Sequence, residues 1–387
     1  MSDPRLKTLA RLLVSYCVHA RPGDRVALRC WGSIAEALPL QAEVMCQVLH
    51  AGAHPHLWFT PDQSEEFDAA FYSEANDAQL EYIDPLYEHL CREFEGHVIA
   101  LCEINPRRLS AIDASRQSLH GRALSDLRRV YLERAGKGDL RWVLVGLPTI
   151  GYADNAGMSL AEYEDFVYSA AFADIDDPVS AWQSVSREQQ RIVDWLAGKQ
   201  QVQVKGPHID LTLSIAGRSF VNCDGHLNMP DGEVFTGPVE DSVSGWVEST
   251  FPAINYGVDV GLVTLRLENG LVVRADAEKN PEQFIRLLDT DAGARRLGEF
   301  GIGTNERIQR FTQNMLFDEK IGGTVHVAVG SSYPETGAVN ESALHWDFLC
   351  DMKAGGQIIV DGHLVYDSGR FLIWAEAAAC STSGRRS

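Results

Sequence analysis

In the first half of the chain, short apolar runs alternate with longer stretches of helical periodicity. The apolar runs have the length of strands and occur at residues 26–30, 56–59, 97–101 and 142–145. The clearest helical stretch spans residues 33–50, and Gly52 and Pro55 interrupt the pattern after it. Strands that alternate with helices are typical of an α/β fold. We therefore expect an N-terminal α/β domain over residues 1–200.

The periodicity changes near residue 200. Ser186 precedes a helical run over residues 187–196 and is a suitable N-cap for it. Beyond this run, apolar and polar residues alternate with period two, which predicts antiparallel strands at residues 202–205, 209–215, 261–267 and 271–275. Pro281 opens one further helix over residues 281–288. We expect a β-rich α+β C-terminal domain over residues 201–387.

The length and charge of the chain indicate how many domains it has and which partners are unfavourable. A chain of 387 residues accommodates two domains at about 150 residues each. Its 34 basic and 54 acidic residues give a net charge of −20, which disfavours binding to nucleic acid and to anionic membranes. No segment is long and apolar enough for a membrane span, and the N-terminus lacks the pattern of a signal peptide. We expect a cytoplasmic protein whose residues 376–387 form a loose tail.

The cysteines and the common motifs exclude several functions. Eight cysteines are spread along the chain with no CxxC pair, so we expect reduced, buried thiols and no zinc ribbon or disulfide framework. Gly301 and Gly303 lack the third glycine of a dinucleotide loop, and neither HExxH nor GxSxG occurs. His54 and His56 would share one strand face, but no carboxylate lies near them in sequence. We expect these two histidines to be packed or on the surface.

Acids and histidines in apolar or glycine-rich surroundings are concentrated between residues 225 and 347. A buried acid is costly unless a cation compensates it. His345 and Asp347 are two residues apart, so both side chains would lie on one face of an apolar strand. The candidates form a plausible ligand set for two divalent metals, and they are Glu233, Glu299, Glu319, His326, His345 and Asp347.

Each of the other candidates also has a purely structural interpretation. Glu233 could cap a turn, and Glu299 could pair with Arg295 or Arg296. Glu319 could pair with Lys320, and His326 could be a hydrogen-bonded core histidine. From the residues alone, these alternatives remain open.

Several segments in order along the chain resemble one known family. They are LPTIGYADNAGMSLAEYEDFVYSAA, GEVFTGP, LGEFGIGTN, DEKIGGTVHVAVG and NESALHWDF. Together they resemble the thermophilic metalloprotease family of metallo-aminopeptidases, of the aminopeptidase T, aminopeptidase S and PepS type. The resemblance covers about residues 146–370. It implies a cytoplasmic homodimer with an α/β N-terminal domain and a β-rich C-terminal domain that carries two metals.

The resemblance also implies an activity and roles for the residues. The protein would hydrolyse the N-terminal peptide bond of peptides through a water bridging two divalent ions, zinc or cobalt, with manganese or magnesium as further options. All six candidate ligands match the positions of the family's ligands, and Tyr333 matches a tyrosine at the site. On this interpretation Glu299 bridges the metals, Glu233 is a ligand or the general base, and Tyr333 donates to the oxyanion. The segment ETGAVNESALHWD lacks a second glycine that the family often has, which bears on a loop beside the site.

Three alternatives remain. A distant relative of the family is an iron-dependent dihydroxypyridine ring-opening dioxygenase, which would use His326, His345 and Asp347 as a facial triad. That chemistry would leave Glu233, Glu299 and Glu319 without a cation. The second alternative is a hydrolase of small, non-peptide amides on the same scaffold. The third is a binding protein without activity that captures a ligand in the N-terminal domain.

Overall fold

The computed structural model describes residues 3–109, 112–255 and 258–373. The chain divides into two compact units, and the first of them also contains a short stretch from beyond the main boundary. Unit 1 is Met1–Gln183 with Gly225–Asp231, and unit 2 is Ser184–Asp224 with Gly232–Ser387. The tail expected at 376–387, and with it Cys380, lies outside the described residues.

The units divide within helix α10 (Pro178–Leu196), whereas the sequence placed the boundary after it. The predicted start of this helix at residue 187 is wrong, because Ser186 lies inside the helix. Asp177 provides the start instead, since its Oδ1 accepts a hydrogen bond from Ser180 N at 3.1 Å and Pro178 occupies the first turn. That 1–200 and 201–387 form separate domains stays a prediction.

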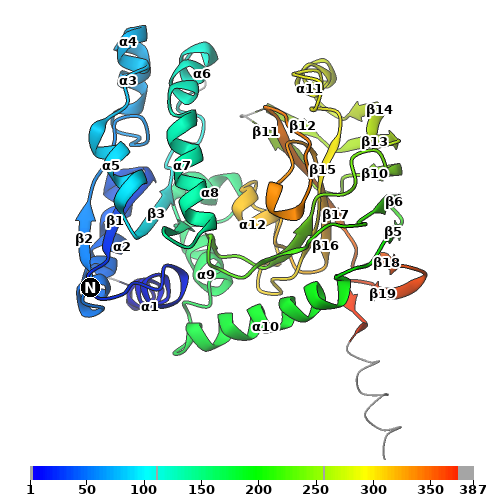
Figure 1. The fold of residues 1–387 in the computed structure, drawn as a ribbon, viewed down its shortest axis with the longest axis horizontal. Coiled ribbons are helices and arrows are strands. Elements are labelled where there is room, and N and C mark those ends of the chain that lie inside the picture. The colour runs from blue at the N-terminus through cyan, green and yellow to red at the C-terminus, as the bar shows by residue number, and fades with distance from the viewer. Residues whose placement is uncertain (1–2, 110–111, 256–257, 374–387) are drawn as a thin grey trace, which may run out of the picture. The chain divides into compact units, whose positions relative to one another are not determined.

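Unit 1 contains a parallel sheet in the order β2-β1-β3-β4-β8. This confirms the expected α/β character of the first half of the chain, and Figure 1 shows β1, β2 and β3 among their helices. The strands are β1 (Arg25–Gly32), β2 (His54–Leu57), β3 (Gly96–Cys102), β4 (Arg141–Gly146) and β8 (Asn228–Met229). The last strand comes from the short segment that returns to unit 1, and no periodicity in so short a segment predicted it.

Helices connect these parallel strands. They are α1 (Pro4–Leu12), α2 (Ile34–His50), α3 (Asp68–Glu74), α4 (Asp77–Leu80), α5 (Pro85–Glu93), α6 (Ala114–Ala123), α7 (Ser125–Gly136), α8 (Ile150–Asn155) and α9 (Leu160–Ala170), with a π-helical turn at Leu13–Cys17. The helix expected at 33–50 is confirmed as α2, with Ser33 as its N-cap.

The N-terminus of α2 is occupied by a carboxylate of the protein itself. Glu66 accepts from Ser33 Oγ at 2.9 Å and from Ile34 N at 3.1 Å. In nucleotide-binding α/β folds, a helix N-terminus of this kind receives a phosphate. Burial acts to raise the pKa of Glu66, but these hydrogen bonds outweigh it and lower the pKa, so the carboxylate stays ionised.

Unit 2 contains two large antiparallel sheets in the described part of the chain. The larger sheet has the order β14-β13-β10-β6-β5-β18-β19-β20. Its strands are β5 (Gln201–Gly206), β6 (Ile209–Ser214), β10 (Ser244–Glu248), β13 (Val263–Glu268), β14 (Leu271–Ala277), β18 (Gln357–Val360), β19 (His363–Asp367) and β20 (Arg370–Phe371). All four strands expected from alternation belong to this sheet.

We call the second one the site sheet, in the order β17-β16-β15-β9-β7. Its strands are β7 (Val221–Cys223), β9 (Glu233–Thr236), β15 (Leu297–Gly303), β16 (Thr324–Gly330) and β17 (His345–Asp351). Figure 1 shows β15, β16 and β17 running side by side. Unit 2 also has the ribbon β11 (Ala253–Asn255) and β12 (Val258–Gly261), the predicted helix α11 (Pro281–Leu288), α12 (Met315–Asp318) and a 3₁₀ turn at Pro334–Thr336.

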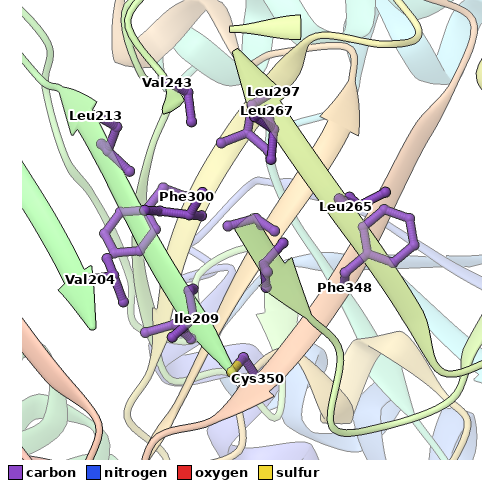
Figure 2. Close-up of a cluster of buried hydrophobic side chains, with 14 of the residues drawn as sticks. Val204, Ile209, Leu213, Val243, Leu265, Leu267, Leu297, Phe300, Phe348 and Cys350 are labelled. Carbon is purple, nitrogen blue, oxygen red and sulfur yellow. The ribbon is translucent and has the colours of Figure 1, made fainter. Parts of the chain in front are cut away.

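The hydrophobic core of unit 2 includes apolar residues of both large sheets. In Figure 2, Val204 and Leu265 of the larger sheet lie in one cluster with Phe300 and Phe348 of the site sheet. Phe300 and Phe348 are each 1% exposed, and truncating such a ring to alanine costs about 3–5 kcal/mol. Because one face of the site sheet belongs to this core, the alternate residues of its strands point to the opposite face.

Two further features concern the cysteines and the apolar character of the helices. No disulfide joins the cysteines within the described residues, and most of them are buried, although Cys46 is exposed and Cys223 is intermediate. No helix in the described ranges is long and apolar enough to cross a membrane.

Candidate metal centre

The face of the site sheet opposite the core carries most of the predicted ligands. Trp346 and Phe348 of β17 lie in the core, so His345 and Asp347 point the other way. In β16, Val325 and Val327 lie in the core, which directs His326 to the same face as His345. Glu233 begins β9 in the same sheet.

Glu299 reaches this face because β15 contains a bulge. Leu297 and Phe300 both lie in the core, although strict alternation would place residues three apart on opposite faces. The register between β15 and β16 shifts between Leu297 and Glu299, and this reverses the alternation. Gly298 makes the close approach possible, since a Cβ there would lie 2.4 Å from the carbonyl oxygen of Gly330.

Glu299 lies between the two histidines. Its Oε1 is 3.2 Å from His326 Nε2, and its Oε2 is 3.4 Å from His345 Nε2. Glu233 Oε2 lies 3.3 Å from His326 Nε2 on one side, and Asp347 Oδ2 lies 3.6 Å from His345 Nε2 on the other. The arrangement consists of two groups that share Glu299.

These two groups have the composition of metal sites. One comprises Glu233, Glu299 and His326, the other comprises Glu299, His345 and Asp347, and in each the ligand atoms lie within 4.8 Å of one another. His345 Nδ1–H donates to the carbonyl of Ser331 at 2.9 Å. This hydrogen bond fixes the ring orientation and leaves Nε2 as the ligand atom, as is usual for metal-binding histidines.

Burial strongly affects the pKa values of the acids at this centre. Burial raises the pKa of Glu233 to about 8 and that of Asp347 to about 6. Burial also acts to raise the pKa of Glu299, but hydrogen bonds with His326 and His345 outweigh it and hold the pKa at about 2. With protein groups alone, these carboxylates compete for too little positive charge.

The two histidines of the centre have raised pKa values. Burial acts to lower their pKa values, but the neighbouring carboxylates outweigh it and raise the pKa of His326 to about 9 and that of His345 to about 10. Asp347 Oδ1 is buried and has no hydrogen-bond partner among the described residues. A cation would satisfy this oxygen and neutralise the acids, so the residues present fit divalent metal ions.

Glu319 is placed differently from the other predicted ligands. It follows α12 and belongs to neither metal-binding group. Its carboxylate contacts the ammonium group of Lys320, which is fully buried and also lies 3.5 Å from Glu233 Oε1. Sequence reasoning considered the pairing of Glu319 with Lys320 but not the link from Lys320 to Glu233.

Tyr333 lies beside the centre. Its ring is 5.3 Å from the ring of His345 and 5.1 Å from that of Phe235. Partial burial, together with the charges of Glu299 and Asp347, raises the pKa of Tyr333 above its usual value. The hydroxyl therefore stays protonated and can donate a hydrogen bond.

Gly301 is a residue of the site that the sequence analysis assigned to no function. It pairs with His326 in the register of β15 and β16. A Cβ at this position would lie 2.0 Å from His326 Nε2, so only glycine leaves room for the imidazole. Its spacing in the sequence could have indicated this role. Gly301 lies two residues from Glu299 and therefore on the same face of the strand.

The histidines at positions 54 and 56 lie elsewhere. Both are in β2 of unit 1, and His56 packs edge-on against Phe94 with ring centroids 4.9 Å apart. Neither belongs to a metal-binding group within the described residues.

A β-rich unit whose sheet face collects buried carboxylates and imidazoles has the features of a metalloprotein. Comparison with known proteins identifies the family. Residues 2–371 match the thermophilic metalloprotease (M29) family, and the chain belongs to it. The family expected from the sequence motifs is confirmed, and with it the metalloprotease class of enzyme.

Similar proteins with curated names are aminopeptidases. Aminopeptidase 2 of Geobacillus stearothermophilus is 28% identical, and the match covers 90% of this chain and 92% of the relative. Aminopeptidase T of Thermus thermophilus is 30% identical over 73% of this chain and 76% of the relative.

Solved structures share the fold. Wild-type AmpT from Thermus thermophilus superposes with a TM-score of 0.81 at 24% identity, over 95% of this chain and 99% of that one. The 2,5-dihydroxypyridine dioxygenase from Pseudomonas putida gives a TM-score of 0.60 at 14% identity, over 96% of this chain and 98% of that one. The latter is a distant neighbour in fold.

Proposed function

We propose that this protein is an aminopeptidase that holds two divalent metal ions, one in each of the groups that share Glu299. The observation that carries the proposal is the position of Glu299 between His326 and His345, with one carboxylate oxygen toward each imidazole. A carboxylate so placed is suited to bridge two cations. Zinc and cobalt suit the mixed imidazole and carboxylate ligands, and manganese or magnesium would suit the carboxylates.

The metal ions would supply an activated water and polarise the carbonyl of the scissile peptide bond. Glu233, Glu299, His326, His345 and Asp347 would hold them. Tyr333 keeps its proton and lies beside His345, so it can donate a hydrogen bond to the oxygen that becomes negative in the transition state.

The transfer of a proton needs a carboxylate that is not a ligand of both metals. We assign this task to Glu319 rather than to Glu233, because Glu319 lies outside both groups and is the more exposed of the two. Lys320 contacts both carboxylates and keeps Glu319 in reach of the centre. Glu319 would accept the proton of the attacking water and pass it to the leaving amine. In the alternative assignment, Glu319 is a ligand and Glu233 is the base. Metal analysis of Glu319→Gln distinguishes the two assignments.

An acidic centre also favours a substrate with a free amino group. The ammonium group of a peptide N-terminus is attracted to the carboxylates, and this aligns the first peptide bond with the site. We further propose that the protein acts in the cytoplasm as a homodimer on peptides and not on nucleic acid, consistent with its net charge of −20.

The test compares a peptide with its N-acetylated form, combined with metal analysis of the purified protein. Peptides with a free N-terminus should be shortened one residue at a time, and acetylation should lower the rate by about 100-fold, because the anchor and the alignment are both lost. Equal rates for both forms would indicate an amide hydrolase of another kind. Consumption of dioxygen with ring-opening of a dihydroxypyridine would instead establish the dioxygenase activity.

A further inference from the structure

Unit 1 contains a cavity of about 200 Å³ whose lining includes charged and aromatic side chains. All residues that line it belong to unit 1, whereas the predicted metal ligands belong to unit 2. It lies where β1, the loop after β2 and the helices α3 to α6 contribute side chains. Those used below are Arg29, Thr60, Asp62, Tyr82, Asp84, Tyr87 and His120.

Arg29 is the unusual member of this lining. It projects from the middle of β1 and is only 2% exposed. Its Nη2 donates to Thr60 Oγ1 at 3.1 Å and to Gln63, and its guanidinium lies 5.0 Å from the ring of Trp58 and 4.7 Å from that of Tyr87. These neutral partners orient the guanidinium but do not neutralise it.

The guanidinium forms no ion pair with a carboxylate among the described residues, although Asp62 of the same cavity attracts it at longer range. Its Nε is buried without a hydrogen-bond acceptor, and Arg29 forms no ion pair there, whereas Arg25 on the same strand pairs with Glu95 at 2.6 Å. A buried charge that forms no ion pair is costly, and such a charge beside a cavity marks a candidate binding residue.

The two acids that line the cavity make their closest contacts with groups other than Arg29. Asp62 pairs with His120, with 3.5 Å between Oδ2 and Nε2. Asp84 caps α5 by accepting a hydrogen bond from Leu86 N at 2.9 Å. The cavity therefore presents a guanidinium beside aromatic rings, and Asp62 and Asp84 make their closest contacts with other groups.

We propose that this cavity binds a small organic carboxylate that carries an apolar or aromatic group. The carboxylate would pair with Arg29 through charge-assisted hydrogen bonds, and the apolar part would pack against Tyr82 and Tyr87. The volume corresponds to roughly seven water molecules, which accommodates a molecule of the size of a phenylpropanoate. Two sources share this chemistry, namely a free amino acid and a simple carboxylic acid.

The test is calorimetric titration of the full-length, metal-loaded protein with 3-phenylpropanoate, 3-phenylpropanamide and L-phenylalanine. The acid should bind at least tenfold more tightly than the amide, because only the acid supplies the missing anion. Binding of L-phenylalanine as tight as that of the acid would identify amino acids as the source, and much weaker binding would identify simple acids. Equal binding of acid and amide, or no binding of either carboxylate, would overturn the proposal.

A matched pair of variants locates the binding. Arg29→Met should lose at least tenfold in affinity for the preferred carboxylate. Arg25→Met should retain the affinity, because Arg25 lies on the same strand and face but does not line the cavity. Hydrogen exchange of the wild type should show protection by the ligand at residues 29–31, 60–62 and 82–87. Protection only in unit 2, or unchanged affinity in a folded Arg29→Met, would overturn the proposal.

A second variant covers the case in which Arg29→Met does not fold. Tyr82 is 62% exposed, so Tyr82→Ala should fold normally and weaken binding severalfold through the loss of the aromatic contact. Hydrolysis of peptides by this variant should be unchanged, since Tyr82 lies in unit 1 and outside the metal centre. Unchanged affinity for the carboxylate in Tyr82→Ala would contradict the proposed position of the ligand.

Discussion

Both units bury charged side chains, but they neutralise them differently. In unit 1, Asp68 is fully buried and pairs with Arg108 Nε at 2.6 Å, and Arg108 also contacts Glu103. In unit 2, three acids and two histidines share one face of the site sheet. Arg108 supplies the counter-charge of Asp68, although Asp68 Oδ1 has no hydrogen-bond partner among the described residues. In unit 2 several acids share the same few cationic side chains, so that arrangement needs added positive charge.

The difference shows how a structural charge cluster is distinguished from a functional one. Arg108 fixes the carboxylates of unit 1 with hydrogen bonds, as is usual where burial serves the fold. Among the described residues, the ion-pair partners of Glu233, Glu299 and Asp347 are His326, His345 and Lys320. Asp347 Oδ1 has no hydrogen-bond partner in the same ranges. What distinguishes the metal site is therefore that several buried acids and imidazoles gather on one sheet face, and the following predictions test this contrast.

The largest effect is expected for Glu299→Gln. The amide cannot bridge two cations, so both metal-binding groups are broken together, and we expect metal content to fall to near zero. The ratio kcat/KM should fall on the order of 1,000-fold or more. Elemental analysis and peptide hydrolysis measure the two quantities.

Asp68→Asn is the matched control in unit 1. It removes a buried charge of the same kind and should lower the free energy of unfolding, because Arg108 loses its partner. The folded fraction should keep its metal and its activity per molecule. Loss of metal in Asp68→Asn, or full metal content in Glu299→Gln, would contradict the contrast between the units.

Tyr333→Phe tests a role in turnover without a role in metal binding. We expect kcat to fall about 100-fold to 1,000-fold, as for the loss of one donor to an oxyanion. Metal content should not change, because Tyr333 belongs to neither metal-binding group. A fall in metal content with kcat unchanged would show that Tyr333 supports the centre rather than the reaction.

Gly301→Ala should weaken the centre by displacing His326. The added methyl group would overlap the imidazole, so we expect metal affinity to fall about 10-fold to 100-fold. Gly121→Ala is the control, since a Cβ at this helical position meets nothing within 4 Å, and its affinity should match the wild type. Titration with a metal indicator measures both. Wild-type affinity in Gly301→Ala would mean that His326 is not a ligand.

The smallest effect concerns His120 in unit 1. The carboxylate of Asp62, 3.5 Å from its Nε2, raises its pKa, while Asp62 itself has a lowered pKa and stays ionised. The pair therefore contributes stability that is fully present below the unfolded pKa of about 6.5. This contribution is lost as the pH rises through the higher pKa of the folded state.

His120→Gln should accordingly lower the free energy of unfolding more at pH 6 than at pH 9. We expect the losses at the two pH values to differ by about 1 kcal/mol or less. Urea unfolding at the two pH values measures the difference, with exposed His54→Gln as the control. A larger loss at pH 9 than at pH 6 would reverse the sign that the ion pair requires.

The sequence determined the elements that depend on local pattern. Ser33 marked the start of α2, and the alternation around residues 345–347 placed His345 and Asp347 on one strand face. Period and capping are properties of neighbouring residues, so they can be read without the fold. The motifs also identified the family, because their order along the chain is itself a property of sequence.

The tertiary structure alone decided how distant segments meet. The bulge before Glu299 depends on pairing with β16, and the contact of Lys320 with Glu233 joins residues far apart in sequence. Local pattern carries no information about such register, because hydrogen bonding between strands sets it. The same reason explains why the two groups that share Glu299, and the guanidinium of Arg29 at a cavity in unit 1, became visible only in the folded chain.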